Sequence, residues 1–335
     1  MTRRALAVWV LAAATATPAS AQTAVLDVTQ SVGTSSEAVS AAGVQVRALA
    51  EPSRGLRLVA EGAWGDRRGP VSDVLGTAYP YGGRIDVIEA YAEWVRRGTG
   101  LRAVRVGRYR TPFGMSGASD HAYLGFLRPP LIRYGSYYAL STGYLEHGLD
   151  VLAGAGPVSI EGSVGRPGDV GDAIRRPGTT RTGRAEVAGR GLVIGLSAID
   201  TTPYLPATFA KGRARYTGVD LRWMRNGVQV RGEWLDGQPF NGTTTTGGYL
   251  DAIVHTRRMD RVTALARVET LDYDTTSRFA LKTHRLSAGA RMRLWQQLAI
   301  SAGLAHQFGQ QTQHERTALD AGITWAWRTD LWPRR

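Results

Sequence analysis

The sequence contains no cysteine, which excludes disulfide bonds and thiolate metal sites. After residue 21 no stretch approaches the roughly 20 consecutive apolar residues that a membrane-spanning helix requires, because Arg, Asp or Glu recurs every few positions. Polar backbone groups inside a bilayer must be paired within the protein, and only helices and closed barrels achieve this. If the mature chain spans a membrane, it therefore spans it as a β-barrel.

Enzyme motifs are also missing. The sequence has no P-loop and no dinucleotide-binding fingerprint. Its histidines show no metal-binding spacing, and His314-Glu315 is followed by Ala318 where a zinc-protease helix needs a second histidine. Glu146-His147 is interpreted as the start of a strand. We therefore predict no catalytic residues, no metal and no cofactor.

The N-terminus has the features of a cleaved secretory signal peptide. Arg3 and Arg4 precede an apolar stretch from Ala5 to Ala14, and Ala19-Ser20-Ala21 supplies the small residues of a cleavage site. An N-terminal membrane anchor is the alternative, but the apolar stretch is too short to cross a bilayer and Pro18 interrupts the residues after it. We predict a signal peptide over residues 1–21 and a single domain over residues 22–335.

The mature chain is predicted to be a meander of β-strands. Alternation of apolar and polar residues recurs throughout it, turn residues separate the segments at regular intervals, and 41 glycines in 335 residues suit many turns. Sixteen strands are expected, over residues 24–33, 40–50, 55–66, 85–97, 101–113, 144–154, 158–166, 180–189, 191–200, 213–224, 228–237, 246–257, 261–271, 280–294, 298–308 and 315–328.

The connections between these strands alternate in length. Short turns, such as Glu51-Pro52-Ser53-Arg54 and Arg225-Asn226-Gly227, alternate with longer segments, notably 67–84, 114–143, 167–179 and 201–212. An outer-membrane barrel has tight periplasmic turns at one end and longer extracellular loops at the other. The even number of strands places both chain termini at the periplasmic end.

The strand residues predict two different faces. In strand 280–294, Leu286, Ala288 and Met292 alternate with arginines, as lipid-facing and lumen-facing positions should. A soluble β-sandwich would show the same alternation with its apolar face inward. Aromatic residues at the strand ends favour the barrel, since Trp and Tyr collect at membrane boundaries. Those expected at periplasmic ends are Trp94, Trp223, Trp295 and Trp327, and those at extracellular ends are Trp64, Tyr109, Tyr144, Trp234, Tyr249, Tyr273, Phe279 and Phe308.

One stretch resembles a known family. Val106-Gly107-Arg108-Tyr109-Arg110-Thr111-Pro112-Phe113-Gly114 is similar to a motif of the phosphate-selective porin O and P family, and the segment from Ser119 to Gly135 is similar to porin-like relatives of it. The resemblance implies a sixteen-stranded barrel, usually trimeric, whose third extracellular loop, here 114–143, folds inward and narrows the pore. Those channels use lysine clusters, whereas this chain has only Lys211 and Lys282.

The charged residues suggest what such a pore would select. Without residues 1–21 the chain keeps 39 basic and 28 acidic residues, a net charge of +11. Lumen-facing arginines would attract anions. However, the lumen face also carries acidic residues, namely Glu161, Glu233, Glu269 and Asp320. It is therefore equally possible that the arginines only form ion pairs with these acids. The predicted pore-lining and constriction residues are Asp120, Arg128, Arg133 and Tyr134 in the loop, and Arg222, Arg231, Glu233, Arg267, Glu269, Arg285, Arg291 and Arg293 in the strands.

The sequence therefore predicts an outer-membrane porin, a passive channel for small hydrophilic solutes with a modest anion preference. The expected partners are outer-membrane lipid, small hydrophilic or anionic solutes and, by the family resemblance, two further copies in a homotrimer. The alternatives are a non-conducting structural or adhesive barrel and, with less support, an outer-membrane enzyme. Nucleic-acid binding is not expected despite a pI of about 10.4, because the arginines are spread singly through the strands.

Overall fold

The structure is a computed structural model that describes residues 23–69, 83–96, 98–115, 128, 130–133, 145–168, 178–202, 213–238, 243–255, 261–275, 280–309 and 316–332. The predicted signal peptide, 1–21, lies outside these residues. None of the helices among them is long and apolar enough to cross a membrane.

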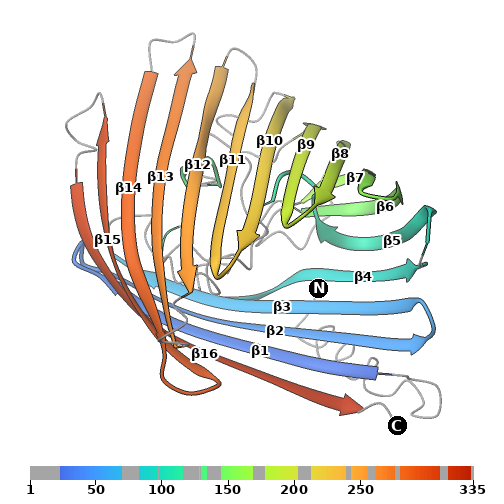
Figure 1. The fold of residues 1–335 in the computed structure, drawn as a ribbon, viewed down its shortest axis with the longest axis horizontal. Helices are drawn as coiled ribbons and strands as arrows, with labels where there is room; N and C mark the ends of the chain where they lie inside the picture. Colours follow the sequence, from blue (N-terminus) through green and yellow to red (C-terminus); the bar gives the residue numbers. More distant parts are fainter. Residues whose placement is uncertain are drawn as a thin grey trace.

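The described residues form one closed antiparallel barrel in which each strand pairs with the strand before it and the strand after it (Figure 1). Its strands are β1 Thr23–Ser35, β2 Val39–Ser53, β3 Leu56–Arg68, β4 Arg84–Val95, β5 Gly100–Arg110, β6 Leu145–Ala155, β7 Val158–Gly168, β8 Thr180–Gly189, β9 Leu192–Thr201, β10 Ala214–Arg225, β11 Val228–Gln238, β12 Thr243–His255, β13 Val262–Thr275, β14 Ala280–Arg293, β15 Leu298–Gly309 and β16 Arg316–Trp332. A single turn of 3-10 helix, η1, spans Leu131–Arg133. The predicted sixteen-stranded barrel is confirmed, and no strand end differs from its predicted position by more than four residues.

Tight turns explain why consecutive strands pair. Arg190 and Gly191 join β8 to β9, and Asn226 and Gly227 join β10 to β11, with all four residues at positive φ. Two residues at positive φ make the turn whose twist matches that of the flanking strands. A side chain at Gly191 would meet the carbonyl oxygen of Met224 at 2.6 Å, so glycine is required there.

The barrel closes where β1 pairs with β16. Ala24 lies opposite Trp332, and Thr23 lies opposite Glu51 near the β2–β3 turn. Both ends of the described chain are therefore at the short-turn end, as predicted. The turn expected at 51–54 was placed too early, because a register shift between Ala50 and Ser53 lets β2 continue through Ser53 before the chain reverses.

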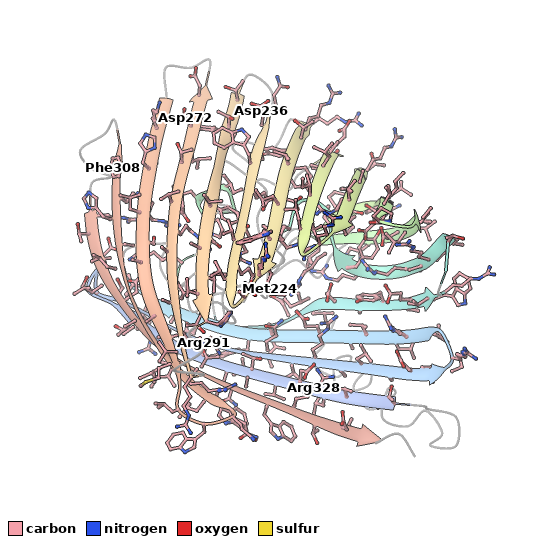
Figure 2. All side chains as sticks on the ribbon, in the orientation of Figure 1. Met224, Asp236, Asp272, Arg291, Phe308 and Arg328 are labelled. Carbon is pink, nitrogen blue, oxygen red and sulfur yellow. The ribbon has the colours of Figure 1, made fainter. Side chains whose placement is uncertain are left out.

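The two faces of the barrel differ in polarity (Figure 2). Large apolar side chains point outward and are exposed, among them Leu196 at 61% and Leu319 at 64%, whereas the inward Arg285 is 1% exposed. A β-sandwich would bury the apolar face and expose the charged one. The observed arrangement is that of a barrel with an apolar environment outside and a polar interior.

Aromatic residues divide between the two faces. Trp234 and Phe308 point outward, as expected for boundary residues, with exposures of 47% and 36%. Tyr109 and Tyr273 lie at the expected ends of β5 and β13, but they and Tyr249 point inward and are at most 6% exposed, so they are not boundary residues on the outer face. The hydroxyls of Tyr109 and Tyr249 donate to the inward carboxylates of Glu146 and Glu233, at 3.3 and 3.5 Å respectively. Tyr144 and Phe279 lie outside the described residues.

Neighbouring residues of β14 test the assignment of faces. Ala288 points outward and Ser287 inward, near the middle of the strand. An arginine on the lipid face near the bilayer midplane costs about 2–4 kcal/mol. We therefore expect Ala288→Arg to lower the free energy of unfolding by that amount and Ser287→Arg to lower it much less. Denaturant titration of the barrel in lipid vesicles measures both, and equal losses would contradict the assignment.

Candidate functional site

The inner face of β11–β14 carries ion pairs between directly opposed residues. Arg231 and Arg267 flank Asp251, with N–O distances of 2.8 and 2.5 Å. Arg285 pairs with Glu269 at 2.6 Å, and Glu269 also lies 3.3 Å from Arg267. None of the five side chains is more than 5% exposed. We call these five residues the buried network. Its three arginines and two carboxylates leave one excess positive charge, and burial keeps all five side chains from solvent.

A second group lies on β8–β10. Arg184 donates to both carboxylate oxygens of Asp220, at 2.5 and 2.9 Å, and to Glu186 at 2.6 Å. Arg222 reaches the same Glu186 at 3.5 Å, and its side chain is 46% exposed. Arg222 is therefore bound at one side and open to the lumen at the other.

A third group covers β2–β6, and most of its residues were not predicted from the sequence. Arg57 pairs with Glu51 at 2.8 Å and with Glu93 at 3.6 Å. Arg47 lies 3.8 Å from Glu61. The alternation in strand 40–50 carries the signal for Arg47, because Val44, Val46 and Ala48 lie on the opposite face.

Arg105 extends this third group along the wall to β7. It contacts Glu93 at 3.2 Å, Asp150 at 3.4 Å and Glu161 at 3.9 Å. Arg110, in the stretch that resembles the phosphate-selective porins, turns toward Glu61 at 2.5 Å. Both arginines are thus committed to the barrel wall.

Some arginine side chains of the inner face are more exposed to solvent than the carboxylates they pair with. Four lumen arginines are more exposed than the carboxylates they pair with: Arg47 at 42% against Glu61 at 3%, Arg57 at 41% against Glu93 at 12%, Arg222 at 46% against Glu186 at 27%, and Arg328 at 70% against Asp27 at 38%. Arg291 and Arg293 also point inward, at the short-turn end of β14. In the described residues, the solvent-accessible layer toward this end is dominated by guanidinium groups.

Arg128 is a loop residue that bonds to three parts of the barrel wall. Its guanidinium donates to both oxygens of Asp320 on β16, at 2.6 and 3.0 Å, and to Glu37 beside β1 at 2.7 Å. Its own carbonyl oxygen accepts a hydrogen bond from Arg267 on β13 at 3.1 Å. Arg128 is 4% exposed, so it bridges the interior instead of lining open water.

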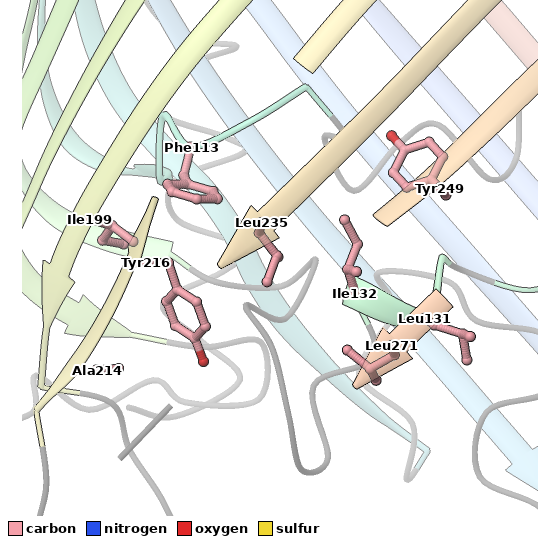
Figure 3. Close-up of a cluster of buried hydrophobic side chains, with 9 residues drawn as sticks. All are labelled: Phe113, Leu131, Ile132, Ile199, Ala214, Tyr216, Leu235, Tyr249 and Leu271. Atoms are coloured by element: carbon pink, nitrogen blue, oxygen red, sulfur yellow. The ribbon is translucent and has the colours of Figure 1, made fainter. Parts of the chain in front are cut away.

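The residues just after Arg128 pack against β12 and β13. Leu131 and Ile132 of η1 are 5% and 0% exposed and belong to an apolar cluster inside the barrel (Figure 3). The other members are Phe113, Ile199, Ala214, Tyr216, Leu235, Tyr249 and Leu271. The described part of segment 114–143 therefore lies within the barrel. Arg133 ends η1, and the predicted constriction residues Asp120 and Tyr134 lie outside the described residues.

The described residues contain no group of three or more His, Cys, Asp or Glu side chains that could hold a metal ion. The Glu146-His147 pair lies in β6, where Glu146 is buried and accepts hydrogen bonds from Thr182 and Tyr109. Its surroundings are those of a structural carboxylate in the barrel wall.

Comparison with known proteins supports the fold. No family model matches the chain, and no curated protein matches its sequence. Among solved structures, OmpF of Salmonella typhi in complex with daunomycin has a TM-score of 0.65 at 8% identity, covering 91% of this chain and 97% of that one. The anion-selective porin from Comamonas acidovorans has a TM-score of 0.60 at 12% identity, covering 90% and 98%. OmpT of Vibrio cholerae in its trimer form has a TM-score of 0.57 at 10% identity, covering 91% and 98%.

These likenesses show that the chain has the porin-type barrel fold. None of them is to a phosphate-selective channel, so the resemblance of residues 106–114 to that family stays a prediction.

Two arginines of different burial test the role of the buried network. Arg267→Leu removes two hydrogen bonds to Asp251 in a dry environment, while Arg231 and Arg285 still contact the two carboxylates, and a hydrogen bond to a charged group contributes about 1.5–3 kcal/mol. Arg328→Leu removes the same charge from an exposed pair, which costs less than about 1 kcal/mol. Denaturant titration in lipid vesicles compares the two. Similar small losses for both variants would show that the network does not stabilise the barrel.

Proposed function

We propose that the chain is an outer-membrane porin, a passive diffusion channel for small hydrophilic solutes. The supporting observation is the interior itself: the closed barrel holds half-exposed charged side chains that require water around them. A sixteen-stranded barrel is wide enough for an aqueous channel, whereas eight strands can be filled by side chains. Solved structures with this fold include proteins described as porins.

We further propose a modest preference for anions. The buried network has one excess positive charge, but none of its side chains is more than 5% exposed, so the preference rests on the exposed Arg47, Arg57 and Arg222. Their side chains are 41–46% exposed, whereas the carboxylates they contact are 3–27% exposed. Fixed positive groups around a pore attract anions and repel cations. In 0.15 M salt this attraction extends only about 8 Å, so the preference weakens as salt rises.

The segment around Arg128 and η1 is proposed to narrow the channel. Arg128 is ion-paired with Asp320 and Glu37, and the residues of η1 pack against Tyr249 of β12 and Leu271 of β13. These two sets of contacts keep this part of segment 114–143 inside the barrel. A homotrimer in the outer membrane completes the proposal, supported by the family resemblance and by the trimer form named for the Vibrio cholerae neighbour.

Planar-bilayer recordings test both parts of this proposal. Across a KCl gradient, we expect the wild-type channel to pass chloride more readily than potassium. The triple variant R47Q/R57Q/R222Q should bring the permeability ratio to about one or below, because it removes the exposed positive layer. The reversal potential gives the ratio directly.

The control variant is R181Q/R215Q, which removes two arginines from the outer face of the barrel. It should leave the reversal potential unchanged. Cation preference in the wild type, or an equal shift in both variants, would contradict the role of the lumen arginines. A folded barrel that never conducts would overturn the porin proposal in favour of a structural or adhesive barrel.

A further inference from the structure

The outer face of β8–β11 is layered at its long-loop end. Directly opposed residues form rows across the four strands. The row nearest the membrane centre contains Ala185, Leu196, Val219 and Trp234. The next row holds Gly183, Ala198, Thr217 and Asp236, and the outermost holds Arg181, Asp200, Arg215 and Gln238. We call these three rows, from the membrane centre outward, the apolar row, the small row and the charged row.

The small row makes a hollow between its neighbours. A depression of about 640 Å³ is lined mainly by residues of the small and charged rows. Below it, Leu196 and Trp234 are 61% and 47% exposed. The tryptophan marks the boundary where the apolar belt of a membrane barrel meets the headgroups. The hollow therefore lies at headgroup height.

Arginines dominate the rim of this hollow. Arg213 and Arg215 both pair with Asp200, the latter at 3.5 Å, and their side chains remain 47% and 65% exposed. Arg181 is exposed on the neighbouring strand, and the exposed Arg166 of β7 lies beyond it. Asp236, labelled in Figure 2 near the end of β11, is the other acidic residue of the rim. Arg181 and Arg215 line the hollow together with Asp200 and Asp236, and Arg213 and Arg166 beside them leave this part of the outer face positive.

We propose that this hollow binds the phosphorylated headgroup of an outer-leaflet lipid. The arginine rim holds the phosphate, the small row accommodates the headgroup, and acyl chains lie along Leu196 and Val219 beside Trp234. A free phosphate would use only the outermost row, whereas a lipid uses all three, and the exposed apolar row favours the lipid. The site rests on the proposed membrane placement but is independent of any solute in the lumen.

Native mass spectrometry of the full chain in detergent tests the site. The probe is phosphatidic acid, a lipid with a phosphate monoester headgroup, with phosphatidylcholine of the same chain length for comparison. R181Q/R215Q should weaken phosphatidic acid binding by about 30-fold, since each arginine beside an anionic headgroup contributes a factor of about five. The matched control R68Q/R225Q removes two exposed arginines elsewhere on the barrel and should bind as the wild type does. The single variant R215Q serves if the double variant does not fold.

Several outcomes would overturn the site. These are equal binding by R181Q/R215Q and R68Q/R225Q, equal binding of phosphatidic acid and phosphatidylcholine, or complete displacement of the lipid by excess inorganic phosphate. If R181Q/R215Q changes the number of chains per particle but binds the lipid as the wild type does, the face is a contact between copies and the lipid site is wrong.

Conductance of the same samples in planar bilayers separates the two proposals. Loss of the lipid site should leave the conductance intact. A barrel that binds the lipid but does not conduct would support the lipid site and overturn the porin proposal.

Discussion

The pairing of β1 with β16 is the constraint on which the rest of the structure depends. In a bilayer each unpaired backbone group costs several kcal/mol, so a sheet with two free edges could not remain there. Pairing β1 with β16 removes both edges at once. After closure, every strand residue faces either outward or inward, and the charged side chains of the chain must be accommodated on the inner face.

That inner face cannot be stabilised as a globular core is, because a barrel of this width leaves space that side chains do not fill. Ion pairs between adjacent strands take part of that role. Asp251 lies between Arg231 and Arg267, and Glu269 faces Arg285, so each pair links strands that are already hydrogen-bonded. The apolar cluster around Ile132 adds to this stabilisation, where residues of η1 cover the wall.

The difference in length between the paired side chains has a consequence for the field in the lumen. A carboxylate on a short side chain stays near the backbone, whereas the guanidinium of arginine reaches farther and remains better exposed. Arg47 above Glu61 and Arg57 beside Glu93 both show this. An interior in which acids and arginines are paired therefore still presents positive charge to the solvent in the lumen. The two expectations drawn from the sequence, anion attraction and pairing with lumen acids, are compatible for this reason.

Local periodicity explains which features could be predicted from the sequence. Strand number, strand direction and the outward face follow from alternation and turn residues, which are properties of neighbouring residues. The bond between Arg128 and Asp320 joins residues 192 positions apart, and only closure of the barrel and the path of the loop bring them together. The inward position of Tyr109 was missed because a tyrosine near a strand end suits a membrane boundary and a polar lumen equally well. The register shift next to Ile88, between Glu61 and Gly62, depends on how two strands fit together and has no local signal.

Arginine occupies three environments in this barrel, and its role differs in each. In the buried network arginine is paired with carboxylates and links strands. Elsewhere on the inner face it is half-exposed to the lumen, and on the outer face of β8–β11 it lies beyond the exposed apolar row. A net charge of +11 does not distinguish these environments. The direction of each side chain does distinguish them. A guanidinium group that points along the inner wall contacts a carboxylate, one that points into the lumen contacts water, and one that points outward contacts lipid. The basic composition of this chain therefore reflects several separate requirements of a membrane barrel, and it is the two-residue period of the strands that assigns each arginine to one of them.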